Sequence, residues 1–517
     1  MPIYTEGALN TTALIVPDLY VQIVAPQTLL LNGVPTDILG VVGTASWGPV
    51  GEPTIIGSMS DYAAAFGPVI ARKYDMGTQV ATAAQQGATN FRCVRVSDGT
   101  DTAASLTLLG AVSFTALCTG SQGNNLVVSL ASGSALSSWR LTVSFPGFSP
   151  EVYDNIIGMG ATLWANMANA VNYGSGVLRG PSTLVVATVV SGNATPLAGL
   201  YAFSTGNPGT DGANQITAAK LVGSDILPRQ GMFALRGQGC ALALLADADD
   251  ATQWSLQVAF GLSESMYMIL TGPSGDSIAN AVTTKMAAGI DSYAAKMMFG
   301  DWIYWYDQTN TVMRLVSPQG VVAGRLANLS PEQSSLNKPL YGIIGSQKSG
   351  QPGAGTATTF ATADLSALLS AGIDVIANPQ PGGAYWGVRG GHNTSSNAAT
   401  NGDNYTRLTN YIARTLSAGM GTYVGHLVNT TLFQNIRATL LAFLNALLGQ
   451  RLLGSTDGSL PFAVVCDVTN NPSSRTALGY VQADCQVQYQ AINERFIVNV
   501  QGGQTVHVSR QNAPVMS

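Results

Sequence analysis

Three acidic residues lie close together at one point of the chain, in a spacing that could bind a metal ion. Asp247, Asp249 and Asp250 resemble the first ligand positions of a calcium-binding loop, in which carboxylates recur along the chain. Such a loop also needs a glycine at its sixth position and a glutamate at its end, and this sequence has neither. We therefore interpret the three aspartates as the acidic start of a helix, where the helix dipole favours carboxylates.

The sequence lacks the motifs that commonly hold phosphates or activate a nucleophile. A phosphate-binding P-loop requires Gly-Lys before Ser or Thr, and no Gly-Lys pair occurs. The patterns G-x-S-x-G and H-E-x-x-H are also missing, and Gly206, Gly209 and Gly212 have the wrong spacing for a dinucleotide-binding turn. The 3 histidines are spread widely along the chain. We therefore assign no catalytic residue, no metal site and no cofactor, and we expect a protein that is not an enzyme.

An aromatic run, Asp301–Tyr306 (DWIYWY), could stack against sugars or nucleotide bases. In a strand, however, alternate residues point to opposite faces. Trp302, Tyr304 and Tyr306 would then lie on one face and Ile303 and Trp305 on the other. We favour a strand of a buried sheet.

The composition limits the partners that this chain can have. Of 517 residues only 23 are basic and 28 acidic, with a net charge of −5, so no excess of lysine and arginine is present to bind nucleic acid. No signal peptide or membrane span is predicted, because the apolar runs are too short. The 5 cysteines are widely spaced and odd in number, which indicates synthesis in a reducing cytoplasm. So few charges suggest surfaces that are covered in an assembly.

Alternating strand-like and helix-like segments predict an α/β multidomain chain with a layered α/β core. A stretch rich in Ser, Thr, Gly and Val interrupts this alternation and reads as an inserted, mostly β domain. A carboxy-terminal α+β domain follows. The predicted divisions are an amino-terminal arm (1–25), the first part of the core (26–97), the insertion (98–205), the second part of the core (206–380), the carboxy-terminal domain (381–500) and a carboxy-terminal arm (501–517).

The carboxy-terminal domain contains the clearest helices. From Thr430 to Gly449 apolar residues recur at intervals of three and four, which predicts one buried helix face. An earlier helix, with Asn404 expected as its cap, has an apolar stripe that leaves Arg407 and Arg414 on its surface. The β-type runs after these helices are 462–468, 480–489 and 496–500.

Strand-like segments at the two ends of the chain are separated from the body by Pro26 and by Gly502-Gly503. A free strand exposes unpaired backbone groups and readily pairs with another chain. Two such arms would link subunits head to tail into rings or helical tubes. The pattern equally allows each arm to complete its own subunit's sheet. An α/β enzyme and another polymerising shell protein remain alternative functions.

Several stretches, in order along the chain, resemble the contractile tail sheath proteins of long-tailed bacteriophages. They are Val16–Val21 (VPDLYV), Gly40–Pro49 (GVVGTASWGP), Ser317–Gly324 (SPQGVVAG), Trp386–Arg389 (WGVR) and Val465–Asn471 (VCDVTNN). The loop 393–401 departs from the family pattern, because it lacks the basic pair expected there.

The resemblance implies a subunit that polymerises as stacked hexameric rings around an inner tail tube and contracts to drive the tube through the host envelope. It implies terminal arms that add strands to the carboxy-terminal sheet of neighbouring subunits, with 462–468 and 480–489 as the receiving strands. The arm residues are Leu19, Tyr20, Val21, Gln22, Ile23, Val24, Thr505, Val506, His507, Val508 and Ser509.

Further expectations follow from the same resemblance. The tube-facing residues would be Arg407, Arg414 and Arg437. The partners would be copies of the chain, the tube protein, and the baseplate and tail terminator proteins, with no direct contact to nucleic acid and no membrane insertion. The protein would be assembled in the bacterial cytoplasm and reside in the virion tail. A related bacteriocin or secretion-type injection system is the alternative setting.

Overall fold

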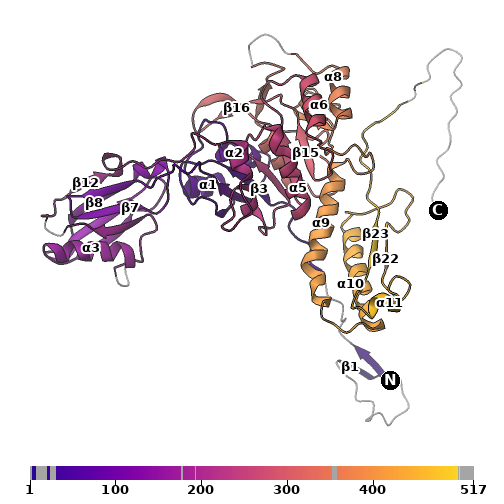
Figure 1. Cartoon of the computed structure of the whole chain (residues 1–517), viewed down its shortest axis with the longest axis horizontal. Coiled ribbons are helices and arrows are strands. Elements are labelled where there is room, and N and C mark those ends of the chain that lie inside the picture. The colour runs from indigo at the N-terminus through magenta and orange to yellow at the C-terminus, as the bar shows by residue number, and fades with distance from the viewer. Residues whose placement is uncertain are drawn as a thin grey trace.

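A computed structural model describes residues 31–175, 179–191, 194–351, 358–498 and 500, together with the backbone of 3–6 and 20–23. A central α/β body lies between a β-rich domain, formed by the insertion, and a helical domain near the carboxyl terminus (Figure 1). Each of these parts has hydrophobic clusters of its own. The mixed α/β fold class predicted from the sequence is confirmed.

The central body is built on a sheet of seven strands in the order β19-β15-β14-β13-β3-β5-β4. All neighbours are parallel except β4 and β5. Strand β3 pairs with β13, so the chain returns to the same sheet after the insertion. The strands are β3 (Leu39–Gly43), β4 (Pro53–Ile56), β5 (Phe91–Arg95), β13 (Leu242–Leu245), β14 (Tyr267–Thr271), β15 (Ala295–Met298) and β19 (Ile373–Asp374).

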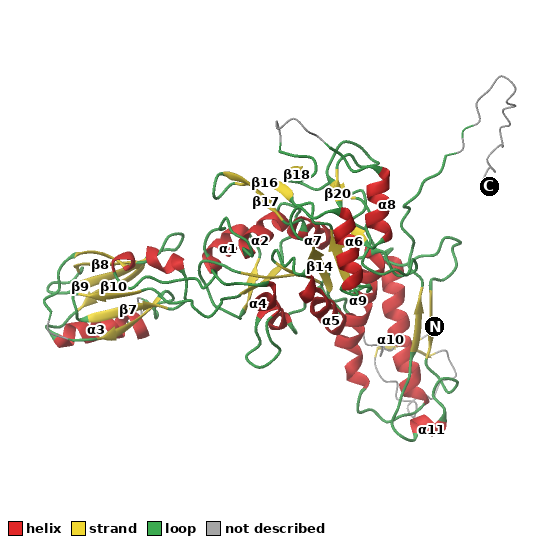
Figure 2. Ribbon diagram, turned by 45° about the horizontal axis from the view of Figure 1, so that its top comes forward, coloured by secondary structure: helices red, strands yellow, loops and turns green. Residues whose placement is uncertain are grey.

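Helices cover both faces of this sheet (Figure 2). Four helices contribute to the hydrophobic cluster on one face and three to the cluster on the other. Buried on both faces, the two strands in the middle of the sheet, β13 and β3, are continuously apolar, as expected for a parallel sheet. The first group is α4 (Ala218–Val222), α5 (Trp254–Glu264), α6 (Ile278–Ala287) and α8 (Thr362–Ser370), and the second is α1 (Met59–Phe66), α2 (Met76–Ala84) and α7 (Gln319–Asn328).

The aromatic run forms part of a small antiparallel sheet on the central body. Its strands are β16 (Ile303–Asp307), β17 (Val312–Val316) and β18 (Ile343–Ser346), with β16 in the middle. Ile303 and Trp305 are buried, whereas Tyr306 is exposed. Within β16 the predicted division into two faces is therefore confirmed, but Trp302, predicted on the face of Tyr306, precedes the strand and is buried. A further short pair joins β20 (Ile376–Ala377) to β21 (Gly387–Val388).

The insertion folds around a separate hydrophobic cluster. It contains one four-stranded sheet, β10-β9-β8-β12, one three-stranded sheet, β11-β7-β6, and the helix α3 (Ala161–Tyr173). At its junction with the body, the buried guanidinium of Arg95 donates to the carbonyl oxygens of Gly48, Thr119 and Asp211. The strands are β6 (Ser105–Leu108), β7 (Val112–Ala116), β8 (Val127–Ser132), β9 (Trp139–Ser144), β10 (Glu151–Ile156), β11 (Val185–Val189) and β12 (Gly199–Ala202).

The carboxy-terminal domain packs two long helices against a two-stranded sheet. Helix α10 (Thr430–Gly449) begins and ends as predicted and buries its apolar face in the cluster of this domain. By length and composition α10 could also cross a membrane, but that apolar face is already covered. The other elements are α9 (Asp403–Gly419), α11 (Ser473–Thr476), β22 (Phe462–Val465) and β23 (Asp484–Val487).

A buried ionic cluster joins α9 to the central sheet. The ammonium of Lys296, on β15, lies 2.7 Å from Asp374 Oδ2 and 3.0 Å from Asp403 Oδ1, and all three side chains are almost fully buried. Ser335 and Tyr267 also donate to the Asp403 carboxylate. Burial alone would raise the pKa of Asp403, but the Lys296 charge and these hydrogen bonds lower it to about 2. Asp403 is the first residue of α9, so the cluster holds the beginning of that helix on the sheet.

Replacing the central cation tests how much this cluster contributes. Lys296→Met leaves two buried carboxylates without a counter-ion, and we expect the free energy of unfolding at pH 7 to fall by about 3–5 kcal/mol. The loss should shrink at pH 4.5, because without the ammonium burial raises the pKa of Asp403 and the carboxyl takes up a proton.

Urea unfolding of the original protein and of Lys296→Met, at pH 7 and at pH 4.5, measures the loss of unfolding free energy at each pH. The matched control is Lys348→Met, because the pair of Lys348 with Asp364 is partly exposed and should contribute less than about 1 kcal/mol. Equal losses for the two variants would contradict the expectation.

Candidate inter-subunit interface

The two-stranded sheet of the carboxy-terminal domain has open edges. Strands β22 and β23 pair antiparallel from Phe462↔Val487 to Val465↔Asp484. Phe462 and Val464 point into the cluster shared with α10, while the alternate residues Ala463 and Val465 are exposed. Within the described part of the chain neither strand has a second neighbour. Each outer edge therefore presents backbone donors and acceptors to which another strand can bind.

Both expected receiving segments contain a strand, although each strand is shorter than predicted. Residues 466–468, 480–483 and 488–489 lie outside β22 and β23. Side chains explain the shortening between the two strands, because Asn470 and Asn471 donate to the backbone carbonyl of Gln482 and hold that part of the chain in turns.

The amino-terminal arm contains a strand at the predicted place. Strand β2 (Tyr20–Ile23) pairs in parallel with β1 (Ile3–Glu6), and this pair joins no other described sheet. Figure 1 shows the pair beyond the far end of the carboxy-terminal domain. Leu19 and Val24, at the two borders of the predicted arm, lie outside the described residues.

The chain that connects this arm to the body runs along α9. The backbone N–H of Val34 donates to the hydroxyl of Thr415, and Thr36 accepts a hydrogen bond from Arg407. A side chain at Gly33 would collide with the ring of Tyr411, so a glycine allows the close approach. The amino-terminal linker therefore leaves the subunit beside the carboxy-terminal domain.

The chain beyond β23 crosses the central body with few contacts. Gln488 donates to the carbonyl of Pro461, and no backbone–backbone hydrogen bond is formed by the described residues after it. Side-chain contacts hold the crossing: the hydroxyl groups of Tyr489 and Thr409 lie 3.2 Å apart, Asn404 donates to the carbonyl of Gln490, and Glu494 lies 2.7 Å from Nε2 of His392. Asn404 was expected as the cap of α9, but Gly402 takes that position.

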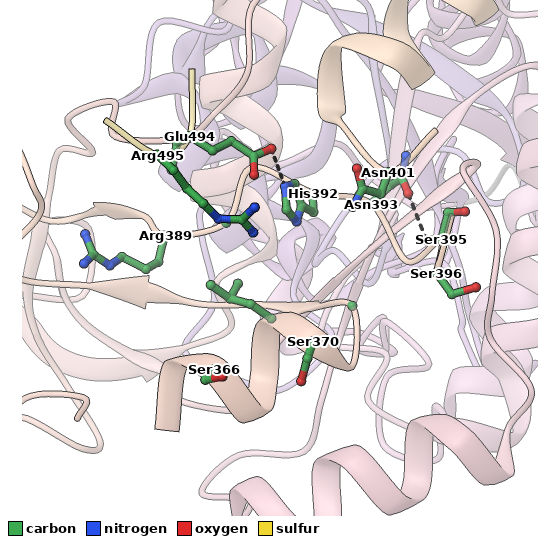
Figure 3. A pocket seen from close by; sticks show the side chains of 14 residues that line it. Ser366, Ser370, Arg389, His392, Asn393, Ser395, Ser396, Asn401, Glu494 and Arg495 are labelled. Atoms are coloured by element: carbon green, nitrogen blue, oxygen red, sulfur yellow. Dashed lines mark hydrogen bonds and ion pairs between the residues drawn. The ribbon is translucent and has the colours of Figure 1, made fainter. Parts of the chain in front are cut away.

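Cavities of about 410, 540 and 410 Å³ flank this crossing segment. In Figure 3 the first cavity is bounded by Glu494 and Arg495 of the segment, by Ser366 and Ser370 of α8, and by the loop that carries His392. The segment therefore lies on the surface of the body without filling the space around it.

Three apolar side chains follow at the end of the segment. Phe496, Ile497 and Val498 are between 64% and 82% exposed, and this stretch, which the sequence predicted as a strand, forms no strand in its described part. An extended apolar stretch with free backbone groups has the properties of a strand that pairs with another chain. The arm residues Thr505, Val506, His507, Val508 and Ser509 lie outside the described residues.

The three arginines expected to face a tube lie in different surroundings. Arg407 is only 5% exposed and donates to the carbonyls of Leu329 and Ser330, so its expected surface position is wrong. Burial lowers its pKa to about 10. Arg414 is half-buried and donates to the carbonyl of Gly239, and burial lowers its pKa. Arg437, on α10, is exposed. Of the three, only Arg437 forms no hydrogen bond or ion pair with the described residues that would keep its side chain inside the subunit.

The acidic residues that resembled a calcium loop have partners in the protein. Asp247 accepts hydrogen bonds from Tyr74 and Gln79, Asp249 pairs with Lys73, and Asp250 accepts a hydrogen bond from the backbone of Thr252 just before α5. The position of Asp250 therefore agrees with its interpretation as the acidic start of a helix. No group of three or more His, Cys, Asp or Glu side chains placed to hold a metal occurs among the described residues.

Sequence patterns missed the residues that connect the parts of the subunit. The buried position of Lys296 could have been predicted, because a lysine inside the apolar run of β15 must have a buried partner. The contact of His392 with Glu494 could not have been predicted, since the two residues are 102 positions apart in the chain.

No protein-family model and no curated protein sequence matches the chain. The chain does match solved structures. The sheath tail protein of Desulfitobacterium hafniense is 15% identical, with a TM-score of 0.56 over 86% of this chain and 93% of that one. The sheath tail protein of Listeria innocua is 14% identical, with a TM-score of 0.56 over 84% and 89%.

A contracted extracellular injection system provides a third match. Its sheath, from the system called PVC, is 12% identical, with a TM-score of 0.54 over 95% of this chain and 98% of that one. These matches extend over most of both chains. The protein therefore has the fold of the sheath subunits of contractile tails and contractile injection systems.

Proposed function

We propose that this protein is the structural subunit of a contractile sheath and polymerises by exchange of terminal strands. One observation carries the proposal: among the described strands, neither β22 nor β23 has a second neighbour, in a chain with the fold of sheath subunits. Strand addition joins subunits through backbone hydrogen bonds, which hold the register while the linkers allow each subunit to rotate. Two arms and two edges allow every copy to bind two neighbours.

In this proposal the subunits form stacked hexameric rings around an inner tube, and contraction is a rigid-body movement of subunits that remain linked. The extended sheath is a kinetically trapped state, and burial of further surface between subunits supplies the free energy of contraction. The scarcity of charge fits this mechanism, because uncharged surfaces cost little to desolvate when neighbours repack.

The tube would contact the carboxy-terminal domain, with Arg437 as the residue available for it. Baseplate and tail terminator proteins would bind the two ends of the sheath. The setting is a virion tail assembled in the bacterial cytoplasm, with the contracting sheath driving the tube through the host envelope for genome delivery. An injection system without a virion is the second candidate, since the PVC sheath matches over 98% of its own length.

The first test is assembly of the purified full-length chain without a tube protein. Negative-stain electron microscopy should show hollow tubes, because copies of one chain supply both the donor strands and the receiving edges. Uniform globular particles at every concentration tried would contradict the proposed polymer.

A second test separates assembly from folding. Replacing Phe496, Ile497 and Val498 with serine should leave the melting temperature of the monomer unchanged, because all three side chains are exposed. Tube formation, measured by sedimentation, should fall at least about ten-fold, as several apolar anchors of an interface are removed together. The control is Leu136→Ser, an equally exposed site in the insertion, which should form tubes normally. Normal pelleting of the triple variant would exclude this stretch as a donor.

A third test concerns the crossing segment after β23, which leads into the carboxy-terminal arm. Glu494→Gln removes the carboxylate that lies 2.7 Å from Nε2 of His392, and trypsin should then cut after Arg495 up to about five times faster, as expected for a partly exposed contact. Mass spectrometry of the full-length monomer follows this cleavage. Asn493→Ala, in the same segment, is the control and should cleave at the original rate. Equal rates for Glu494→Gln and the original protein would show that the pair does not hold the segment.

A further inference from the structure

The small antiparallel sheet β17-β16-β18 has an apolar outer face. Its central strand buries Ile303 and Trp305 against the body, so the alternate residues of the strand point away from it. These are two tyrosines, and their cross-strand partners on β17 are apolar, as is the exposed residue at the bulge of β18. We call this surface the tyrosine face, and it consists of Tyr304, Tyr306, Met313, Leu315 and Ile344.

The tyrosine face has the composition of a protein interface. The outer face of an antiparallel sheet that is in contact with water normally carries polar side chains. Here none of the five side chains is charged, although Tyr306, Met313 and Ile344 are between 36% and 44% exposed. Tyrosine and methionine are enriched in the centres of protein–protein interfaces, and charged residues are depleted there. The face is therefore suited to binding an apolar group of another protein chain.

A second exposed apolar feature lies on the loop that follows α4. Ile226 and Leu227 are 79% and 76% exposed, and we call this pair the apolar tip. Ser224 and Gln230 close the loop through two backbone hydrogen bonds, and Asp225 forms two ion pairs at its base. Because the loop is already held in place, binding through its tip costs little conformational entropy.

The tip and the tyrosine face lie on opposite sides of the main sheet. The elements on either side of the tip, α4 and the 3-10 helix η4 (Gly231–Leu235), contribute to the hydrophobic cluster on one face of that sheet. The buried side of β16 contributes to the cluster on the other face. Figure 2 shows β16, β17 and β18 above the sheet and α4 below it. One copy can therefore bind a second copy with its tip and a third copy with its tyrosine face.

We propose that the apolar tip docks on the tyrosine face of a second copy of this chain. The inference rests on the proposed polymer and adds a contact between the bodies of neighbouring subunits to the exchanged strands. A contact between two different surfaces of one chain repeats from copy to copy, so it builds rings or helical assemblies and does not end at a dimer.

The size of this contact also favours a polymer. Two side chains of the tip and five of the tyrosine face can bury on the order of a few hundred Å², whereas a stable pair of proteins buries at least roughly 1,200 Å². The contact is therefore too small to hold a dimer by itself and depends on copies that the terminal arms already link. Since no charge is buried, the contact can break and form again at little cost in desolvation.

Disulfide trapping in the full-length protein tests this contact. The double variant Leu227→Cys with Tyr306→Cys has one new thiol on each of two opposite faces. Oxidation with copper phenanthroline at high protein concentration should give a ladder of covalent dimers, trimers and larger species on a gel without reductant. An equal mixture of the two single variants should stop at dimers, because each copy then has only one new thiol.

Two further variants separate docking from random collision. The matched control combines Tyr306→Cys with Leu136→Cys, a fully exposed leucine of the insertion, and should give no ladder. The original protein, with its 5 free cysteines, provides the background. Adding Ile226→Asp to the trapping variant should lower the yield of multimers about ten-fold, because an apolar anchor of the contact becomes a charge without a partner.

The results that contradict the contact are equally definite. A trapping variant that gives no more multimers than the control would overturn the proposal. Dimers of the single variant Tyr306→Cys in the same yield as the ladder would also overturn it, because they would show that two tyrosine faces bind each other.

Trapping and tube formation are scored separately. A ladder from a protein that forms no tubes would support the contact and contradict the proposed sheath. Tubes of the trapping variant without a ladder would overturn the contact alone.

Discussion

The arrangement of this subunit depends on one buried ammonium group. Lys296 lies on β15, beside the edge strand β19, and reaches Asp374 on β19 and Asp403 at the start of α9. These carboxylates come from positions 78 and 107 residues away in the chain. Because an unpaired buried charge is far more costly than a paired one, the three segments must lie together. The axis of α9, and with it the carboxy-terminal domain, is therefore set by the core sheet.

The body of the molecule is covered, whereas its terminal segments lack neighbours among the described residues. Helices cover both faces of the seven-stranded sheet, but β22 and β23 have no second strand beside them in the described part of the chain, and the described residues after Gln488 form no backbone–backbone hydrogen bond. Such a division suits a subunit that moves as a rigid body while its terminal segments pair with other copies. The low content of charged residues also suits such a subunit, because surfaces with few charges cost little to desolvate when they repack against other copies.

Several features could be predicted because they depend on local patterns. The spacing of apolar residues located α10 to its first and last residue, and alternation divided the aromatic run of β16 into a buried and an exposed side. Arg407 was placed wrongly for a clear reason. The sequence of α9 shows one apolar stripe, but the helix is buried on two sides, by α10 and by the body, and its second buried side consists of arginine and asparagine. Periodicity detects apolar contact faces and cannot detect polar ones.

The class of fold and a strand near the amino-terminal end can be read from the sequence, because propensity and periodicity act over a few neighbouring residues. Which charges meet depends on the folded chain. The ionic cluster of Lys296, the contact of His392 with Glu494 and the hydrogen bonds of Arg407 to Leu329 and Ser330 each bring together residues that are far apart in the chain. Electrostatic compensation operates through space at a few ångströms, so only the folded chain determines which of 51 charged residues lie side by side.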